Sequence, residues 1–141
     1  MSTGKNKEVI LRFDDVVMNQ RNLVALDEFV AQDVIDHQVP PGLPPGIEGK
    51  RQFLGMLLNA FPDLHITIEG DLIAEGDYVA ERWTLEGTHQ GELIGIPATG
   101  KRVKVAGMSI SRLVDGKQVE HWSVMDQFGL LQQIGVIPMP G

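Results

Sequence analysis

Asp126 is a carboxylate that the sequence places beside apolar side chains at the end of a strand. The pair Asp115-Gly116 favours a two-residue hairpin turn, so the segments on either side are expected to pair as antiparallel strands. Alternation along the second strand puts Trp122, Val124 and Asp126 on one face. A carboxylate beside an indole and an aliphatic side chain is poorly solvated, which favours its protonated form. The pattern therefore predicts a group that exchanges protons near neutral pH.

A second interpretation of Asp126 is structural. It directly precedes the segment QFGLLQQIG, which has helical character, and aspartate is among the favoured residues at a helix N-cap. Capping favours the anion, so it opposes the proton affinity that an acid needs. The opposite face of the strand carries Val119, His121, Ser123 and Met125, and this alternation predicts His121 at the sheet surface.

Seven further residues are predicted to shape a pocket around Asp126. His37 and His89 stand at the mouths of loops, where either could donate a hydrogen bond to a substrate carbonyl. Glu81 and Arg82 are neighbours on one strand and cannot both face inward; we expect Arg82 to do so, although the alternation also allows the opposite face. Arg112 lies on the strand paired to that of Asp126 and could be its electrostatic partner. The predicted pocket residues are His37, Arg82, His89, Arg112, Trp122, Phe53 and Leu57.

Several kinds of site are not indicated. The four histidines lie on separate segments without the spacing of metal ligands, so no metal site is predicted. The loop GELIGIPATGK lacks a phosphate-binding pattern, and no serine lies in the GxSxG context of acyl-enzyme chemistry.

The elements that must position these residues follow from hydrophobic periodicity. Apolar residues at helical spacing predict helices over residues 5–18, 23–30 and 47–61, the last one ended by Pro62. Alternating residues predict strands over 64–68, 78–88 and 103–114, followed by the hairpin and a last helix that ends near Gly135. Helices followed by antiparallel strands favour a single α+β domain over residues 1–141, in which a curved sheet wraps around the N-terminal helices to form a cone-shaped pocket.

Composition narrows the class of protein. The 141 residues, 43% of them apolar, suffice for one domain with a real core, and no apolar run is long enough to cross a membrane. A net charge of -7 argues against a nucleic-acid partner. The chain has no cysteine, which excludes thiol chemistry and disulfides, and its N-terminus lacks a secretory pattern, so a cytoplasmic protein is expected.

Three stretches taken together resemble the SnoaL-like polyketide cyclase family, within the superfamily named for nuclear transport factor two. They cover most of residues 47–135 and read IEGKRQFLGMLLNAFPDL, GTHQGELIGIPATGKRV and DGKQVEHWSVMDQFGLLQQIG. The resemblance does not identify a substrate, because that superfamily hosts several enzyme activities and non-catalytic binders on one scaffold.

The resemblance implies a cofactor-free, metal-free intramolecular aldol ring closure of an aromatic polyketide ester. Asp126 matches the family's aspartate at the end of the last strand, which acts as general acid and base. A small apolar or aromatic substrate and a homodimer formed through the outer sheet face are also implied, with Val119, Ser123 and Met125 expected on that surface. The alternatives are a non-catalytic binder of small molecules, or an epoxide hydrolase or hydroxylase-like relative, for which Glu120 would be the second carboxylate.

Overall fold

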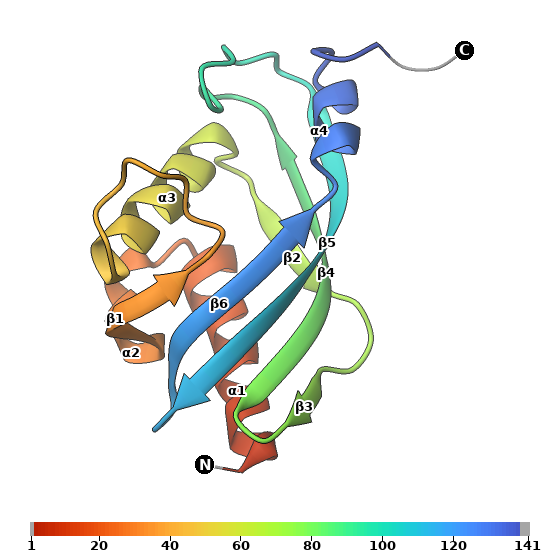
Figure 1. Ribbon diagram of the computed structural model, residues 1–141. Coiled ribbons are helices and arrows are strands. Elements are labelled where there is room, and N and C mark those ends of the chain that lie inside the picture. The colour runs from red at the N-terminus through yellow and green to blue at the C-terminus, as the bar shows by residue number, and fades with distance from the viewer. Residues whose placement is uncertain (1, 139–141) are drawn as a thin grey trace.

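The computed structural model describes residues 2–138 and contains four α-helices and a six-stranded sheet (Figure 1). The chain begins with α1 (Thr3–Phe13), which continues into a π-helical segment (Asp14–Asn19), and then forms a 3-10 turn (Leu23–Ala25) and the short α2 (Leu26–Phe29). These elements confirm the first two predicted helices.

A parallel strand and the longest helix follow. Strand β1 (Val30–Asp36) leads into the proline-rich loop, and α3 (Ile47–Ala60) comes after it. The helix ends directly before the Phe61-Pro62 pair, as predicted, because the residue preceding a proline is disfavoured in helical conformation.

The remaining chain forms the antiparallel part of the sheet. Its elements are β2 (His65–Ile68), β3 (Ile73–Glu75), β4 (Tyr78–Thr88), β5 (Arg102–Val114), β6 (Lys117–Met125) and α4 (Gln127–Gln133). Asp115 and Gly116 both have positive φ angles, of 51° and 77°, as the predicted two-residue turn requires.

The strands run in the order β1-β6-β5-β4-β2, with β3 also paired to β4, and only the β1–β6 pair is parallel. The main core lies between the inner sheet face and the helices, and includes Leu26, Phe29, Leu54, Phe61 and Leu85. In Figure 1 the helices α1 and α3 lie on one side of the curved sheet, and α4 leaves the far end of β6. This arrangement confirms the predicted α+β class with a curved, mostly antiparallel sheet.

None of the helices within residues 2–138 combines the length and the apolar character that a membrane span requires.

Candidate active site

A cavity opens between the inner sheet face and the helices. Its wide part has a volume of about 690 Å³ and is walled mainly by apolar side chains from the loops, α3 and α4, including Phe61, Leu93 and Leu130. A narrow part of about 80 Å³ continues inward. The predicted residues Phe53 and Leu57 line both parts. The two parts form one cone, with an apolar mouth and a narrow end.

The narrow end holds a buried polar network on three different elements. Asp36 and His121 are register partners on the parallel strands β1 and β6, and the Nδ1 atom of His121 lies 3.0 Å from Oδ1 of Asp36. Lys50 on α3 donates from Nζ to the other carboxylate oxygen at 2.5 Å. The side chains of Lys50 and Asp36 are 2% and 3% exposed. Each oxygen of the buried carboxylate therefore has a partner.

The charges of this network set its protonation. Burial alone would raise the pKa of Asp36, but the hydrogen bond from His121 and the positive charge of Lys50 outweigh burial and hold that pKa well below its usual range. Burial and Lys50 lower the pKa of His121, although Asp36 opposes them. At neutral pH, Asp36 is an anion and His121 is a neutral ring with its proton on Nδ1. Its Nε2 is then a base.

A second pair of acids lies beside the network. Asp14 on the π-helical segment and Glu81 on β4 both line the narrow end. Burial raises the pKa of Asp14 to about 6. Burial, followed by the negative charge of Asp14, raises the pKa of Glu81 to about 10. A raised pKa means that the folded chain binds the proton more tightly than the unfolded chain, so this pair destabilises the fold as pH rises above about 4.5.

Hydroxyl groups connect the two sides of the narrow end. The indole nitrogen of Trp83 donates to Oγ of Ser109 at 2.8 Å, and Ser109 donates to Oγ of Ser123 at 2.9 Å. All three side chains lie at the narrow end. The chain of donors runs across β4, β5 and β6, and fixes the direction in which the serine hydroxyls point.

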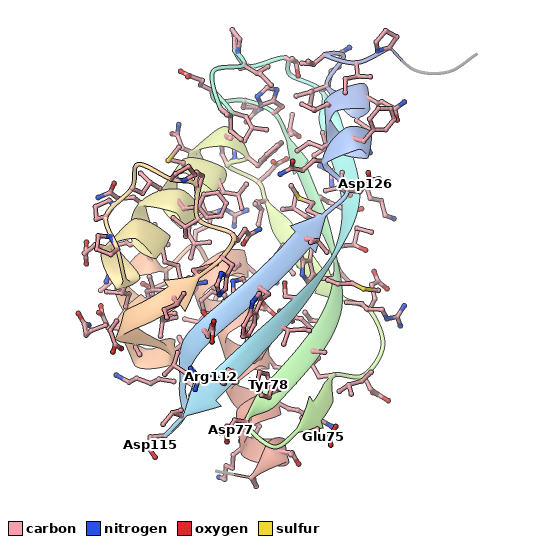
Figure 2. All side chains as sticks on the ribbon, viewed as in Figure 1. Glu75, Asp77, Tyr78, Arg112, Asp115 and Asp126 are labelled. Atoms are coloured by element: carbon pink, nitrogen blue, oxygen red, sulfur yellow. The ribbon has the colours of Figure 1, made fainter. Side chains whose placement is uncertain are left out.

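The poorly solvated surroundings predicted for Asp126 are absent. Asp126 is exposed, and its Oδ1 accepts a hydrogen bond of 2.9 Å from the backbone nitrogen of Gly129 as the N-cap of α4. It lines a groove on the outer sheet face and lies beyond the last residue of β6, where Figure 2 shows it at the turn into α4. The structural interpretation of Asp126 is therefore confirmed, whereas its acid-base role stays a prediction.

Replacing Asp126 by alanine should remove this cap. We expect Asp126→Ala to lower the free energy of unfolding by about 1 kcal/mol, the usual cost of losing an aspartate N-cap. Chemical denaturation of the variant and the parent measures the difference. The replacement Asp33→Ala, at an exposed position of β1, is the matched control, and equal stability of all three proteins would contradict the capping role.

Three predicted pocket residues lie on the outer face of the sheet instead. The expectation that Arg82 faces inward is wrong: Arg82 is exposed, and Glu81 faces the cavity. Trp122 lies on the same outer face, where it is 6.3 Å from the ring of Tyr78. Arg112 pairs with Glu120 at 3.5 Å and, as Figure 2 shows, lies at the opposite end of the sheet from Asp126, so it is not the partner of that carboxylate.

The two predicted loop histidines differ in position. His37 lines the wide mouth of the cone, where Nε2 lies 2.8 Å from Oε2 of Glu120 and the ring stacks on Trp122 at 5.2 Å. His89 is fully buried, and its Nδ1 lies 2.9 Å from Oγ1 of Thr99. It holds the loop after β4 in place rather than lining the cone.

The predicted inner and outer faces of β6 were reversed. His121 is buried and lines the narrow end, so its predicted place at the sheet surface is wrong. Ser123 and Met125 also line the cone, and therefore do not belong to an outer surface. The outer face is apolar at Trp122 and Val124, whereas the inner face is polar at this point, so alternation alone could not distinguish the two.

Two residues of the narrow end had a signal in the sequence. Asp14 follows Ile10 by four residues, and Lys50 stands between Ile47 and Leu54 at helical spacing, so both polar residues occupy the buried face of their helix. A charged residue at such a position needs a buried partner. Asp36, the partner of Lys50, could not be identified, because the pairing of β1 with β6 is not visible in the sequence.

Within residues 2–138, no group of three or more histidine, aspartate or glutamate side chains is arranged to hold a metal ion.

Comparison with known proteins agrees with this architecture. A sequence model of the SnoaL-like polyketide cyclase family matches residues 7–134. The nogalonic acid methyl ester cyclase of Streptomyces nogalater is 28% identical over 111 residues, which are 78% of this chain and 83% of that protein. The aklanonic acid methyl ester cyclase DnrD of Streptomyces peucetius is 38% identical over 60 residues, which are 43% of this chain and 41% of that protein. That second match thus spans less than half of either protein.

Solved structures extend the likeness to the whole domain. TsrD from Streptomyces laurentii superposes with a TM-score of 0.88 at 29% identity, covering 97% of this chain and 99% of TsrD. AclR from Streptomyces galilaeus, described provisionally as a hydroxylase, superposes with a TM-score of 0.85 at 31% identity, covering 99% of this chain and 87% of AclR.

Proposed function

The chain belongs to the SnoaL-like polyketide cyclase family, and from this premise we propose that it catalyses a cofactor-free intramolecular aldol ring closure of a polyketide ester held in the cone. The observation that supports this function most strongly is the succession of an apolar mouth of about 690 Å³ and a narrow end with a neutral histidine oriented by a carboxylate. A flat apolar substrate suits the first part, and proton transfer suits the second.

In this proposal, His121 is the general base. Asp36 accepts a hydrogen bond from Nδ1 and so keeps the ring in one orientation, with Nε2 available to remove a proton from the activated carbon of the substrate. The enolate carbon then attacks a ketone carbon of the same molecule, and the ketone oxygen becomes an alcohol. The proton lost from carbon is balanced by the proton gained by oxygen, so substrate and product are isomers and the reaction needs no external oxidant or reductant.

Asp126 is the alternative acid-base residue implied by the family resemblance. Its exposure and its capping hydrogen bond give it water and a backbone amide as neighbours, which is a poor setting for a proton-transfer group. We therefore assign the chemistry to the cone. The variant Asp126→Asn distinguishes the two assignments, because asparagine is also a good N-cap. It keeps turnover if the chemistry lies in the cone, and loses turnover if Asp126 is the acid-base residue.

The direct test is turnover of nogalonic acid methyl ester, the substrate in the name of one relative. Incubation with the chain should yield a cyclised isomer of identical mass. Chromatography and the change in optical absorption measure its formation. Binding without any conversion would favour the non-catalytic binder instead, and would reject the cyclase.

We further propose a homodimer formed through the outer sheet face. No helix covers this face among residues 2–138, and Val124 on β6 is 72% exposed there. The same face carries other exposed apolar side chains, namely Ile73, Tyr78, Met108 and Ile110. A contiguous apolar surface of this kind is typical of a protein–protein interface. The surface that the resemblance implies is thus the face of Val124 rather than that of Ser123.

Substitution of Val124 by arginine tests the dimer. We expect Val124→Arg to be monomeric under conditions in which the parent is dimeric, because the charge would be buried without a partner in the interface. Val24 is 86% exposed on the 3-10 turn, away from the sheet, so Val24→Arg is the matched control and should remain dimeric. Sedimentation velocity distinguishes the two states. A monomeric parent, or a dimeric Val124→Arg variant, would reject this interface.

A further inference from the structure

We propose that Glu81 is the general acid of the site, a neutral carboxyl group that gives its proton to the substrate oxygen made negative by formation of the carbon–carbon bond. This inference depends on the ring closure proposed above and adds a second reacting group to it.

The position of Glu81 suits this role. Its register partner on β5 is Ser109, whose partner on β6 is Ser123, so the three residues form one row across the inner face. Neighbouring strands are about 4.8 Å apart, which separates the backbone of Glu81 from β6 by roughly 10 Å. His121 lies two residues from Ser123 on that strand. A substrate in the narrow end therefore lies between the proposed base on β6 and the proposed acid on β4.

The surrounding charges explain why this acid is neutral. Besides Glu81, the titratable groups that face the narrow end are Asp14, Lys50 and His121. Asp36 lies behind them, bonded to Lys50 and to His121. Lys50 is the only cation of this network within residues 2–138, and it is already bound to Asp36. Asp14 and Glu81 would add two more anions, and two adjacent buried carboxyl groups cannot both ionise at low cost.

The carboxyl groups of Asp14 and Glu81 share one proton. A hydrogen bond between the two side chains favours the anion of Asp14 and the protonated form of Glu81. The pair is buried, with Asp14 only 7% exposed, and both side chains line the narrow end. A substrate oxygen that becomes negative in the narrow end therefore competes with Asp14 for the proton of Glu81.

The proton balance of the step is complete. Nε2 of His121 takes the proton as the carbon–hydrogen bond breaks, and the carbon–carbon bond forms as the carbonyl π bond breaks. The resulting alkoxide takes the proton of Glu81. After the product leaves, the imidazolium gives its proton to solvent and Glu81 takes one up, so both groups return to their starting states. Substrate and product are isomers.

Glu81→Gln tests the assignment, because glutamine keeps the shape of the side chain but has no acidic proton. The probe is nogalonic acid methyl ester in deuterated buffer, with cyclisation and hydrogen exchange at the reacting carbon followed separately. We expect kcat for cyclisation to fall about 100-fold or more, with KM changed less than about threefold and exchange retained. Glu86→Gln is the matched control: Glu86 lies on the outer face of the same strand and pairs with Lys104.

An infrared measurement at pH 8 gives a readout that does not depend on substrate. The parent should show the carbonyl band of a protonated carboxylic acid, and Glu81→Gln should lack it, while Glu86→Gln keeps it. Turnover by Glu81→Gln within about threefold of an active parent would overturn the inference, as would an ionised Glu81 at pH 8. An inactive parent would instead reject the ring closure itself, and the role of Glu81 with it.

Discussion

The variant His121→Asn is expected to lose at least about 99% of the cyclisation rate while remaining folded. Asparagine can still donate a hydrogen bond to Asp36 from its amide, as Nδ1 of His121 does at 3.0 Å, but it has no atom that can act as the Nε2 base. Loss of a general base commonly slows a reaction by about 100-fold to 10,000-fold. Measurement of kcat and KM with the methyl ester tests this, and kcat should account for most of the loss.

A matched control separates the base from a general effect of losing a histidine. His65 is exposed on β2, so His65→Asn should keep the activity of the parent. The pH profile provides an independent readout. Because burial and Lys50 lower the pKa of His121, the neutral base persists below pH 6.5, and activity should fall with acid only below that value. Full activity of His121→Asn would contradict the proposed base.

The variant Lys50→Met is expected to produce the largest loss of stability. Methionine fills a similar volume, but it removes the partner of Oδ2 of Asp36, while Oδ1 keeps His121 and the backbone nitrogen of Gln38. Removing one member of a buried ion pair commonly costs about 3–5 kcal/mol. The free energy of unfolding from denaturant titration measures this loss. Lys104→Met is the control, because Lys104 is 73% exposed and its pair with Glu86 contributes little.

The pH dependence of the Lys50→Met variant has a defined sign. In the parent, the pKa of Asp36 is lower in the folded chain than in the unfolded chain, so the network stabilises the fold above about pH 4 and this contribution is lost as the pH falls further. Without Lys50, the pKa of Asp36 rises, and the stability gap between variant and parent should narrow in acid. Equal free energies of unfolding of Lys50→Met and the parent at pH 7 would contradict the role of Lys50.

The fold could be predicted because its causes are local. Periodicity, the Asp115-Gly116 turn and the proline after α3 each specify an element within a few residues, and the structure confirms them. The parallel pairing of β1 with β6 joins residues 85 positions apart, Asp36 and His121, and no local pattern encodes it. The fold class was therefore accessible, while this central contact of the candidate site was not.

Residues of β6 were assigned to the wrong sheet face because polarity is inverted along part of the sheet. An inner sheet face is usually apolar, and the tryptophan side of β6 was accordingly assigned to the pocket. Here the inner face carries His121 and Ser123 beside a polar cavity, whereas the outer face carries the exposed Val124. On β4 the inner face is apolar as usual, at Val79, Trp83 and Leu85, so the wrong choice of Arg82 over Glu81 has no such cause. A strand with a polar cavity on its inner side and an uncovered apolar surface on its outer side has alternating polar and apolar residues. An ordinary strand with an apolar inner side shows the same alternation, so the sequence does not tell which side is inner.

A crystal structure of the protein with the cyclised product bound would test the central claim most directly, because it places the reacting atoms. We predict the new alcohol oxygen within hydrogen-bond distance of Glu81, with the reacting carbon facing Nε2 of His121 and the rings in the apolar mouth. A product bound in the outer groove, with its alcohol beside Asp126, would contradict this account and return the acid-base role to that residue.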